Sequence, residues 1–104
     1  MTASSTPELG ALDGLAVLQA LSDPVRLEIV RQLSGCGADG EIQCGEIRLP
    51  VTKSTASHHF KTLSAAGIIA EREEGTRKYF SLRRDELDRR FPGLIDSVLK
   101  ATSP

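Results

Sequence analysis

The sequence predicts a mainly α-helical domain that carries one small β-hairpin. Two observations lead to this fold class. Apolar residues recur at helical spacing in several segments, each bounded by polar capping residues, glycine or proline. The pattern changes over residues 68–82, where two runs rich in isoleucine, tyrosine and phenylalanine meet at Glu74 and Gly75, which is typical of a hairpin. With 104 residues, 39% hydrophobic and 26% charged, the chain has the size of one compact domain.

The first two helices are expected in the N-terminal third. After a small polar tail at residues 1–8, which we expect to be disordered, apolar residues at helical spacing predict a helix over about residues 9–21. These apolar residues are Leu9, Leu12, Leu15, Ala16 and Leu18. The next segment, SDPVRLEIVRQLSG, predicts a helix that is capped by Ser22 or Asp23 and stops at Gly35.

Two further helices are expected before the hairpin. The stretch IQCGEIRL, residues 42–49, is long enough only for a short helix, which Pro50 would end. Thr52 is a good N-cap and Gly67 a good left-handed terminator for a longer helix over about residues 53–66.

Two segments follow the hairpin. The stretch RRDELDRR, residues 83–90, predicts a charged helical turn or linker. Pro92 then opens an amphipathic helix over about residues 92–101. Its apolar side carries Leu94, Ile95, Val98 and Leu99. We therefore expect a single domain over residues 9–101.

The charge is divided unequally along the chain. The net charge is -1, but residues 1–47 carry -5 and residues 48–104 carry +4, and no acidic residue lies between Arg48 and Ala70. An anionic partner would meet no local repulsion in that window. No apolar run approaches the roughly 20 residues that a membrane span requires, and no secretion signal is evident. We therefore expect a cytoplasmic protein without a membrane partner.

The helix expected over residues 53–66 has two different faces. Ala56, Phe60, Leu63 and Gly67 fall on one narrow side, which should pack on the domain. The opposite side carries Ser54, His58 and Lys61, with Thr55 and Ser57 at its edges. Short hydroxyls, an imidazole and one cation suit the major groove of double-stranded DNA, although a merely solvated face is the simpler alternative.

The two histidines of the chain are adjacent, at positions 58 and 59. His58 points outward as a candidate base or phosphate contact, whereas His59 lies on the shoulder and is expected to pack or hydrogen-bond within the protein. Neighbouring helix positions diverge by about 100°, and no other metal-ligating residue lies three or four positions away, so this pair does not predict a metal site.

The order of a short helix, a tight turn, a helix with a polar face and a hairpin is that of a winged helix-turn-helix. The sequence resembles the ArsR family of bacterial transcriptional regulators over about residues 12–83. The resemblance rests on LSDPVRLEIVRQL, on STASHHFKTLSAAGII and on EREEGTRKYFSL. The second segment is the most specific, because Ser-x-x-Ser-His-His-x-Lys-x-Leu followed by Ala-Gly is close to a family hallmark.

The resemblance implies a DNA interface and a homodimer. It places Lys53, Ser54, Thr55, Ser57, His58 and Lys61 on or beside the DNA-reading surface, and Arg72, Arg77 and Lys78 on the wing near phosphates or the minor groove. Dimerisation would use the first and last helices, through Leu9, Leu12, Leu15, Leu94, Ile95, Val98 and Leu99. These apolar stripes exceed what so small a core needs, although the two helices could instead pack on each other within one chain.

The regulatory elements of many relatives are not matched. Those relatives sense metal through a Cys-x-Cys pair before the recognition helix or through ligands on the last helix, whereas this sequence has only Cys44 at the first place and no histidine or cysteine at the second. Three alternatives stay open for Cys36 and Cys44: a thiol metal site, a reversible disulfide, or one buried and one incidental thiol. We expect no resident metal or cofactor.

Together these patterns predict a sequence-specific DNA-binding transcriptional regulator, a homodimeric repressor at an inverted-repeat operator. No P-loop, nucleotide fingerprint or hydrolase motif is present, so an enzyme is not expected. The alternative is a winged-helix module that binds a protein without reading DNA. A small-molecule or redox effector is compatible with either function.

Overall fold

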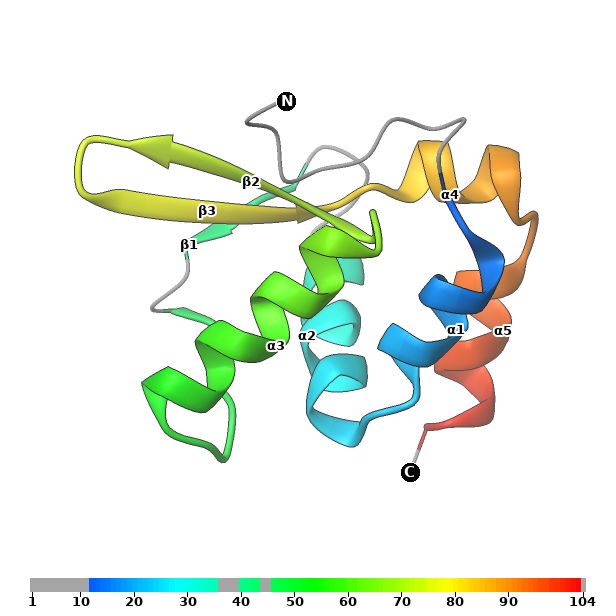
Figure 1. The fold of residues 1–104 in the computed structure, drawn as a ribbon, viewed down its shortest axis with the longest axis horizontal. Coiled ribbons are helices and arrows are strands. Elements are labelled where there is room, and N and C mark those ends of the chain that lie inside the picture. The colour runs from blue at the N-terminus through cyan, green and yellow to red at the C-terminus, as the bar shows by residue number, and fades with distance from the viewer. Residues whose placement is uncertain (1–11, 36–39, 44–45, 104) are drawn as a thin grey trace.

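The computed structural model describes residues 12–35, 40–43 and 46–103. The elements are α1 (Gly14–Leu21), α2 (Pro24–Ser34), β1 (Ile42–Gln43), α3 (Lys53–Ala65), β2 (Ile69–Glu74), β3 (Arg77–Leu82), α4 (Arg84–Arg90) and α5 (Leu94–Ala101). In Figure 1 the β2–β3 hairpin projects beyond the helices on one side, whereas α1, α4 and α5 lie together on the other. This is the predicted mainly helical fold with a small hairpin wing.

Side-chain caps fix the starts of the first three helices. Asp23 accepts hydrogen bonds from the N–H groups of Val25 and Arg26, at 2.9 and 3.0 Å, and so begins α2 at Pro24. Thr52 accepts from the Thr55 N–H at 3.2 Å and begins α3 as predicted. Helix α1 starts only at Gly14, because Asp13 is its N-cap. The helical prediction for residues 9–11 lies outside the described residues.

The end of α3 is a complete Schellman motif. The Ile68 N–H donates to the Leu63 carbonyl at 3.0 Å, and the Gly67 N–H donates to the Ser64 carbonyl at 3.0 Å. Gly67 lies between them at φ +81°, in the left-handed region that glycine adopts without a steric penalty. The predicted stop is therefore confirmed, and the chain turns directly from α3 into β2.

The short helix predicted over residues 42–49 is wrong at its start: residue 46 lies in a 3₁₀ turn, but residues 42–43 are not helical. Residues 42–43 form strand β1, which pairs antiparallel with β3 through Ile42 opposite Phe80 and Gln43 opposite Tyr79. The sheet order is β1-β3-β2, so β1 covers what would otherwise be a free edge of β3. A segment this short cannot sustain a helix without packing partners, and a sheet edge gives it backbone hydrogen bonds instead.

The hairpin has the predicted position, but its turn lies one residue further along than predicted, because Glu74 still belongs to β2. Strands β2 and β3 pair from Ile69 opposite Leu82 to Glu74 opposite Arg77, which leaves a two-residue loop. The first loop residue, Gly75, has φ +62°, and the second has no positive φ, which fits a type II′ turn.

The C-terminal segments are both helical. The charged stretch after the hairpin was predicted to be either a helical turn or a linker, and it forms the helix α4. Helix α5 begins at Leu94 and not at Pro92, because Gly93 takes φ +78° and serves as its N-cap. In the described ranges, no helix is long and apolar enough to cross a membrane.

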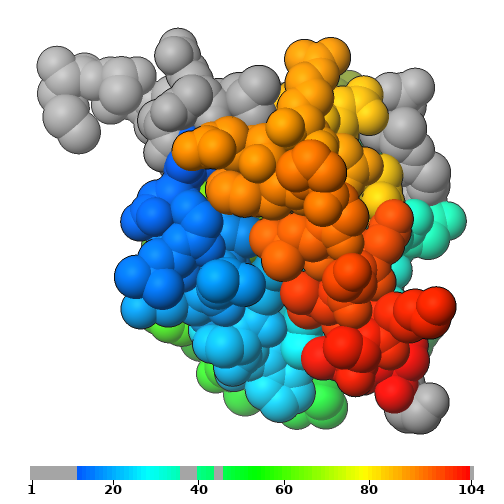
Figure 2. Space-filling model, turned by 90° about the vertical axis from the view of Figure 1, so that its right-hand side faces the viewer, coloured from blue at the N-terminus to red at the C-terminus, as the bar shows by residue number. Residues whose placement is uncertain are grey.

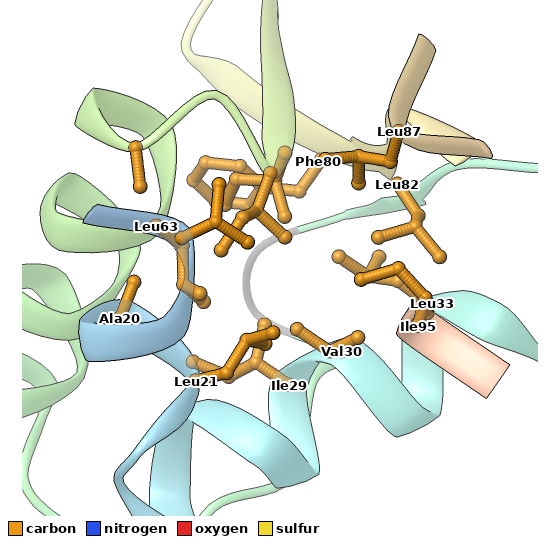
Figure 3. Packing of buried hydrophobic residues seen from close by; sticks show 14 of the residues in the cluster. Ala20, Leu21, Ile29, Val30, Leu33, Leu63, Phe80, Leu82, Leu87 and Ile95 are labelled. Atoms are coloured by element: carbon orange, nitrogen blue, oxygen red, sulfur yellow. The ribbon is translucent and has the colours of Figure 1, made fainter. Parts of the chain in front are cut away.

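The core joins every helix to the sheet. Figure 3 shows Ala20, Leu21, Ile29, Val30, Leu33, Leu63, Phe80, Leu82, Leu87 and Ile95 converging on one cluster. Ile95 of α5 and Leu12 before α1 are only 1% and 4% exposed, so the structure places them in the core of this chain and not on its surface. In contrast, Leu15 and Leu18 are 64% and 49% exposed. Burying a side chain of this size contributes about 1.5–3 kcal/mol, which fixes α5 on the domain through Ile95.

Candidate nucleic-acid interface

Helix α3 presents the polar face that its sequence predicts. The side chains of Lys53, Ser54, Thr55, Ser57, His58 and Lys61 are all exposed. On the opposite side Leu63 is fully buried, and the ring of Phe60 stacks on Phe80 with centroids 4.4 Å apart and planes within 5°. This aromatic pair anchors α3 to β3, and stacked pairs of this kind contribute about 0.5–1.5 kcal/mol beyond the area they bury. The apolar face of α3 is thus packed on the domain, while its polar face is exposed to solvent.

The first turn of α3 favours an anion. It contains no acidic residue, and its backbone N–H groups form the positive end of the helix dipole. Lys53 is exposed at this end, and Lys61 is exposed two turns further along. The face therefore combines phosphate-binding groups with the hydroxyls and imidazole that contact base edges.

His59 ties α3 to the rest of the domain, which agrees with the shoulder position predicted for it. It is 9% exposed, and its Nδ1 lies 3.1 Å from Nη1 of Arg26. Because a guanidinium can only donate, Nδ1 must accept, and the neutral imidazole carries its proton on Nε2. Asp23 Oδ2 lies 3.9 Å from the same Nδ1.

Arg26 is the positioning residue that the sequence analysis missed. Its Nε donates to the Ala20 carbonyl at 2.6 Å, and its Nη2 donates to the Gln19 carbonyl at 3.4 Å. One side chain on α2 therefore binds both the end of α1 and His59 on α3. No local pattern indicates this role, because the acceptors on α1 lie six and seven residues before Arg26 and His59 lies 33 residues after it.

Asp23 has an electrostatic role as well as a capping role. Partial burial acts to raise the pKa of its carboxyl group. The hydrogen bonds from the N–H groups of Arg26 and Val25, together with the positive charge of the Arg26 side chain, outweigh that effect, and the net pKa lies below its ordinary value. The cap of α2 thus stays ionised at neutral pH, next to the Arg26 guanidinium.

The wing separates the basic residues that the sequence grouped together. Side chains alternate between the two faces of a strand, and Lys78 is two residues from the buried Phe80, so it shares the face that looks toward α3. Arg77 and Arg72 belong to the opposite face, in register with Glu74 and Tyr79. The structure therefore brings Lys78 together with the cations of α3 and leaves the two arginines apart from them.

Arg72 is occupied within the chain. Its guanidinium makes a bidentate contact with Glu41 at 2.9 to 3.2 Å, a second contact with Glu74 at 3.0 Å, and lies over the Tyr79 ring at 4.6 Å. The hydrogen bond from Arg72 lowers the pKa of the Glu41 carboxyl, and the same bonds raise the pKa of Arg72. A phosphate would have to displace two carboxylates to bind this side chain.

A metal site is not formed by the described residues. Within residues 12–35, 40–43 and 46–103, no three histidine, cysteine, aspartate or glutamate side chains come close enough to hold an ion. The cysteine alternatives concern Cys36 and Cys44, which lie outside the described residues.

The fold and the α3 face define a class: a winged helix-turn-helix protein with an open recognition helix. A helix-turn-helix domain family matches residues 21–72. The chain is similar to the uncharacterized HTH-type transcriptional regulator YceK of Bacillus subtilis, with 42% identity over 79% of this chain and 82% of the relative. It is also similar to the arsenical resistance operon repressor of Staphylococcus xylosus, with 32% identity over 69% and 67%.

Solved structures agree with this class. A possible transcriptional regulatory protein of Mycobacterium bovis superimposes with a TM-score of 0.67 and 26% identity, over 86% of this chain and 90% of that one. Reduced HlyU of Vibrio cholerae gives a TM-score of 0.66 over 86% and 88%, and at 24% identity it supports the fold alone. The chain belongs to the ArsR family of helix-turn-helix transcriptional regulators, as its sequence predicted. It is a DNA-binding regulator and not an enzyme.

Proposed function

We propose that this regulator is a homodimeric repressor that binds an inverted repeat in double-stranded DNA, in the cytoplasm. The observation that carries the proposal is the exposed, acid-free polar face of α3, anchored from behind by Phe60 and His59. Two relatives support repression by their names: the arsenical resistance operon repressor and the transcriptional repressor SdpR of Bacillus subtilis.

Direct base contacts are assigned to Ser54, Ser57 and His58, and phosphate contacts to Lys53, Thr55 and Lys61. Hydroxyl and imidazole groups donate or accept at base edges, whereas an ammonium group binds phosphate as a point charge. Lys78 is assigned to a phosphate contact from the wing, on the face of the hairpin that looks toward α3. Arg77 and Arg72 are assigned to phosphates further out, and Arg72 must first leave its carboxylate partners.

The dimer contact is assigned to the face that α1 and α5 share. Figure 2 shows α1, in blue, and α5, in red, on the same side of the molecule. Leu15 and Leu18 are the exposed apolar residues there, and Leu94, Val98 and Leu99 are half-buried beside the core. A two-fold contact would place the two recognition helices in successive major grooves, about 34 Å apart. We expect Leu15→Glu to yield a monomer in sedimentation while Leu63 and the rest of the core keep the fold.

Lys61→Ala tests the DNA interface. In fluorescence anisotropy with a duplex from upstream of the gene, we expect weaker binding and a salt slope reduced by about 1. The slope falls because the variant makes one phosphate contact fewer and therefore releases about one counterion fewer on binding. The matched control is Lys100→Ala, which removes an exposed cation from α5, and it should leave both quantities unchanged.

Sequence reading is tested separately. We expect Ser54→Ala and His58→Ala to change the ranking of operator variants more than the overall affinity. The alternative, a protein-binding module, predicts weak salt dependence and no preference over an unrelated competitor duplex. Equal binding of both duplexes by the wild-type chain would therefore refute the repressor proposal.

A further inference from the structure

The surface is hollowed between α3, the wing and the chain segment that leads into α3. This hollow, called here the α3–wing groove, has a volume of about 390 Å³, within the range of small-molecule sites. Its three boundaries can be followed in Figure 1 as α3, strand β3 and the turn that precedes α3. The groove is lined by Ile47, Leu49, Val51, Lys53, Ala56, Ser57, Phe60, Lys61, Glu71, Lys78 and Phe80.

The floor of the groove is apolar. The stacked rings of Phe60 and Phe80 are 6% and 2% exposed, so only their edges are available. Leu49, Val51 and Ala56 are half-buried and complete the floor. Covering such a floor with an apolar group is favourable in proportion to the area removed from water.

The rim of the groove is cationic. Lys53 and Lys61 reach it from α3 and Lys78 from β3, against one carboxylate, Glu71. All four side chains are exposed. A net charge of two positive units around an apolar floor complements a molecule with an apolar body and an acidic group. A free phosphate would match the lysines but leave the floor uncovered.

We propose that the α3–wing groove binds an amphipathic organic anion, an aromatic or aliphatic body with one carboxylate or sulfonate, and that this ligand competes with DNA. The competition follows because Lys53, Ser57 and Lys61 belong both to the groove and to the DNA surface of α3. That second part rests on the proposed function. The ligand would thus act as an inducer that occupies the recognition helix directly, without a change of fold.

The first test uses the full chain without DNA and anilinonaphthalene sulfonate as the probe, followed by its fluorescence. Lys78→Gln should weaken binding about threefold, the loss expected for one partly exposed ion pair. Arg77→Gln is the matched control, because it removes the same charge one residue away on the opposite face of the wing. Equal effects of the two variants would show attraction by general charge and would overturn the site.

The second test fills the groove. Ala56→Phe places a ring over the floor, and we expect it to weaken probe binding more than tenfold while the melting temperature confirms the fold. Undiminished binding would overturn the site. If Ala56→Phe does not fold, the surface variant Lys78→Gln still decides. The neutral analogue phenylnaphthylamine should bind more weakly than the sulfonate, and equal affinity would overturn the anionic class of the ligand.

The competition is measured last, on the complex with the operator duplex. The probe should displace the wild-type protein at concentrations that follow its own Kd, and it should not displace Ala56→Phe. Binding of the probe without displacement would overturn the competition. Failure of the probe-free protein to bind any duplex specifically would instead refute the repressor function, and the binding test without DNA would be unaffected.

Discussion

Replacing Arg26 by alanine should weaken the contact of α2 with α1 and α3. The guanidinium donates to the Ala20 carbonyl at 2.6 Å and to His59 Nδ1 at 3.1 Å, and a third contact to the Gln19 carbonyl is long, at 3.4 Å. Hydrogen bonds from charged donors contribute about 1.5–3 kcal/mol each. Arg26 is half-buried, so the lower value applies to the two short bonds.

The expected loss for Arg26→Ala is therefore about 3 kcal/mol of the free energy of unfolding. For a domain of this size, that corresponds to a melting temperature lower by roughly 12–24 °C. Thermal unfolding followed by circular dichroism measures it directly. DNA affinity should also fall, because His59 loses the partner that fixes the orientation of α3.

Two further variants make the test specific. Arg26→Lys keeps the charge, but one ammonium group cannot reach both acceptors as the fork does, so we expect about half the loss. Arg77→Ala removes an exposed arginine at the hairpin end and should change stability by no more than about 0.5 kcal/mol. A melting temperature of Arg26→Ala within about 2 °C of the wild type would refute the assigned role.

Two other predictions concern the wing and the end of α3. Glu41→Gln removes the bidentate partner of Arg72 and leaves only Glu74, so DNA binding should be tighter and the salt slope larger by up to about 1. Asp85→Asn makes the same charge change at an exposed position on α4 and should not change the slope. An identical slope for both variants would exclude Arg72 from the interface. Gly67→Ala should cost about 1–2 kcal/mol in urea unfolding, because Gly67 has φ +81°. Gly35→Ala should be nearly neutral, since Gly35 has φ -70° and an added Cβ would lie 3.5 Å from its nearest neighbour. Similar losses of unfolding free energy for the two glycine variants would contradict the argument from the positive φ of Gly67.

Local patterns were sufficient for most of the helices and for the hairpin. Asp23 and Thr52 start their helices and Gly67 ends one. The hydrogen bonds that do this join residues at most five positions apart, so a short sequence window contains all the partners. The polar face of α3 follows from helical periodicity alone. The family hallmark around His58 is likewise contained in one short segment of the sequence.

What the sequence could not decide depends on partners distant along the chain. Residues 42–43 became a strand because Phe80 and Tyr79 offer them a sheet edge. Arg72 is held by Glu41, 31 residues earlier, which no spacing rule indicates. The pairing of Arg26 with His59 spans 33 residues and exists only because α2 and α3 pack together.

The sequence by itself determined the class of protein, the helix caps and the face that α3 exposes, since each depends on interactions within a few residues. Only the tertiary structure decided which apolar residues of the terminal segments remain on the surface and which cations remain free of carboxylates. Ile95 is buried while Leu15 is exposed, although both belong to apolar stripes of similar pattern. Burial and ion pairing depend on what the folded chain places opposite each side chain, and that is fixed only when all the elements are packed.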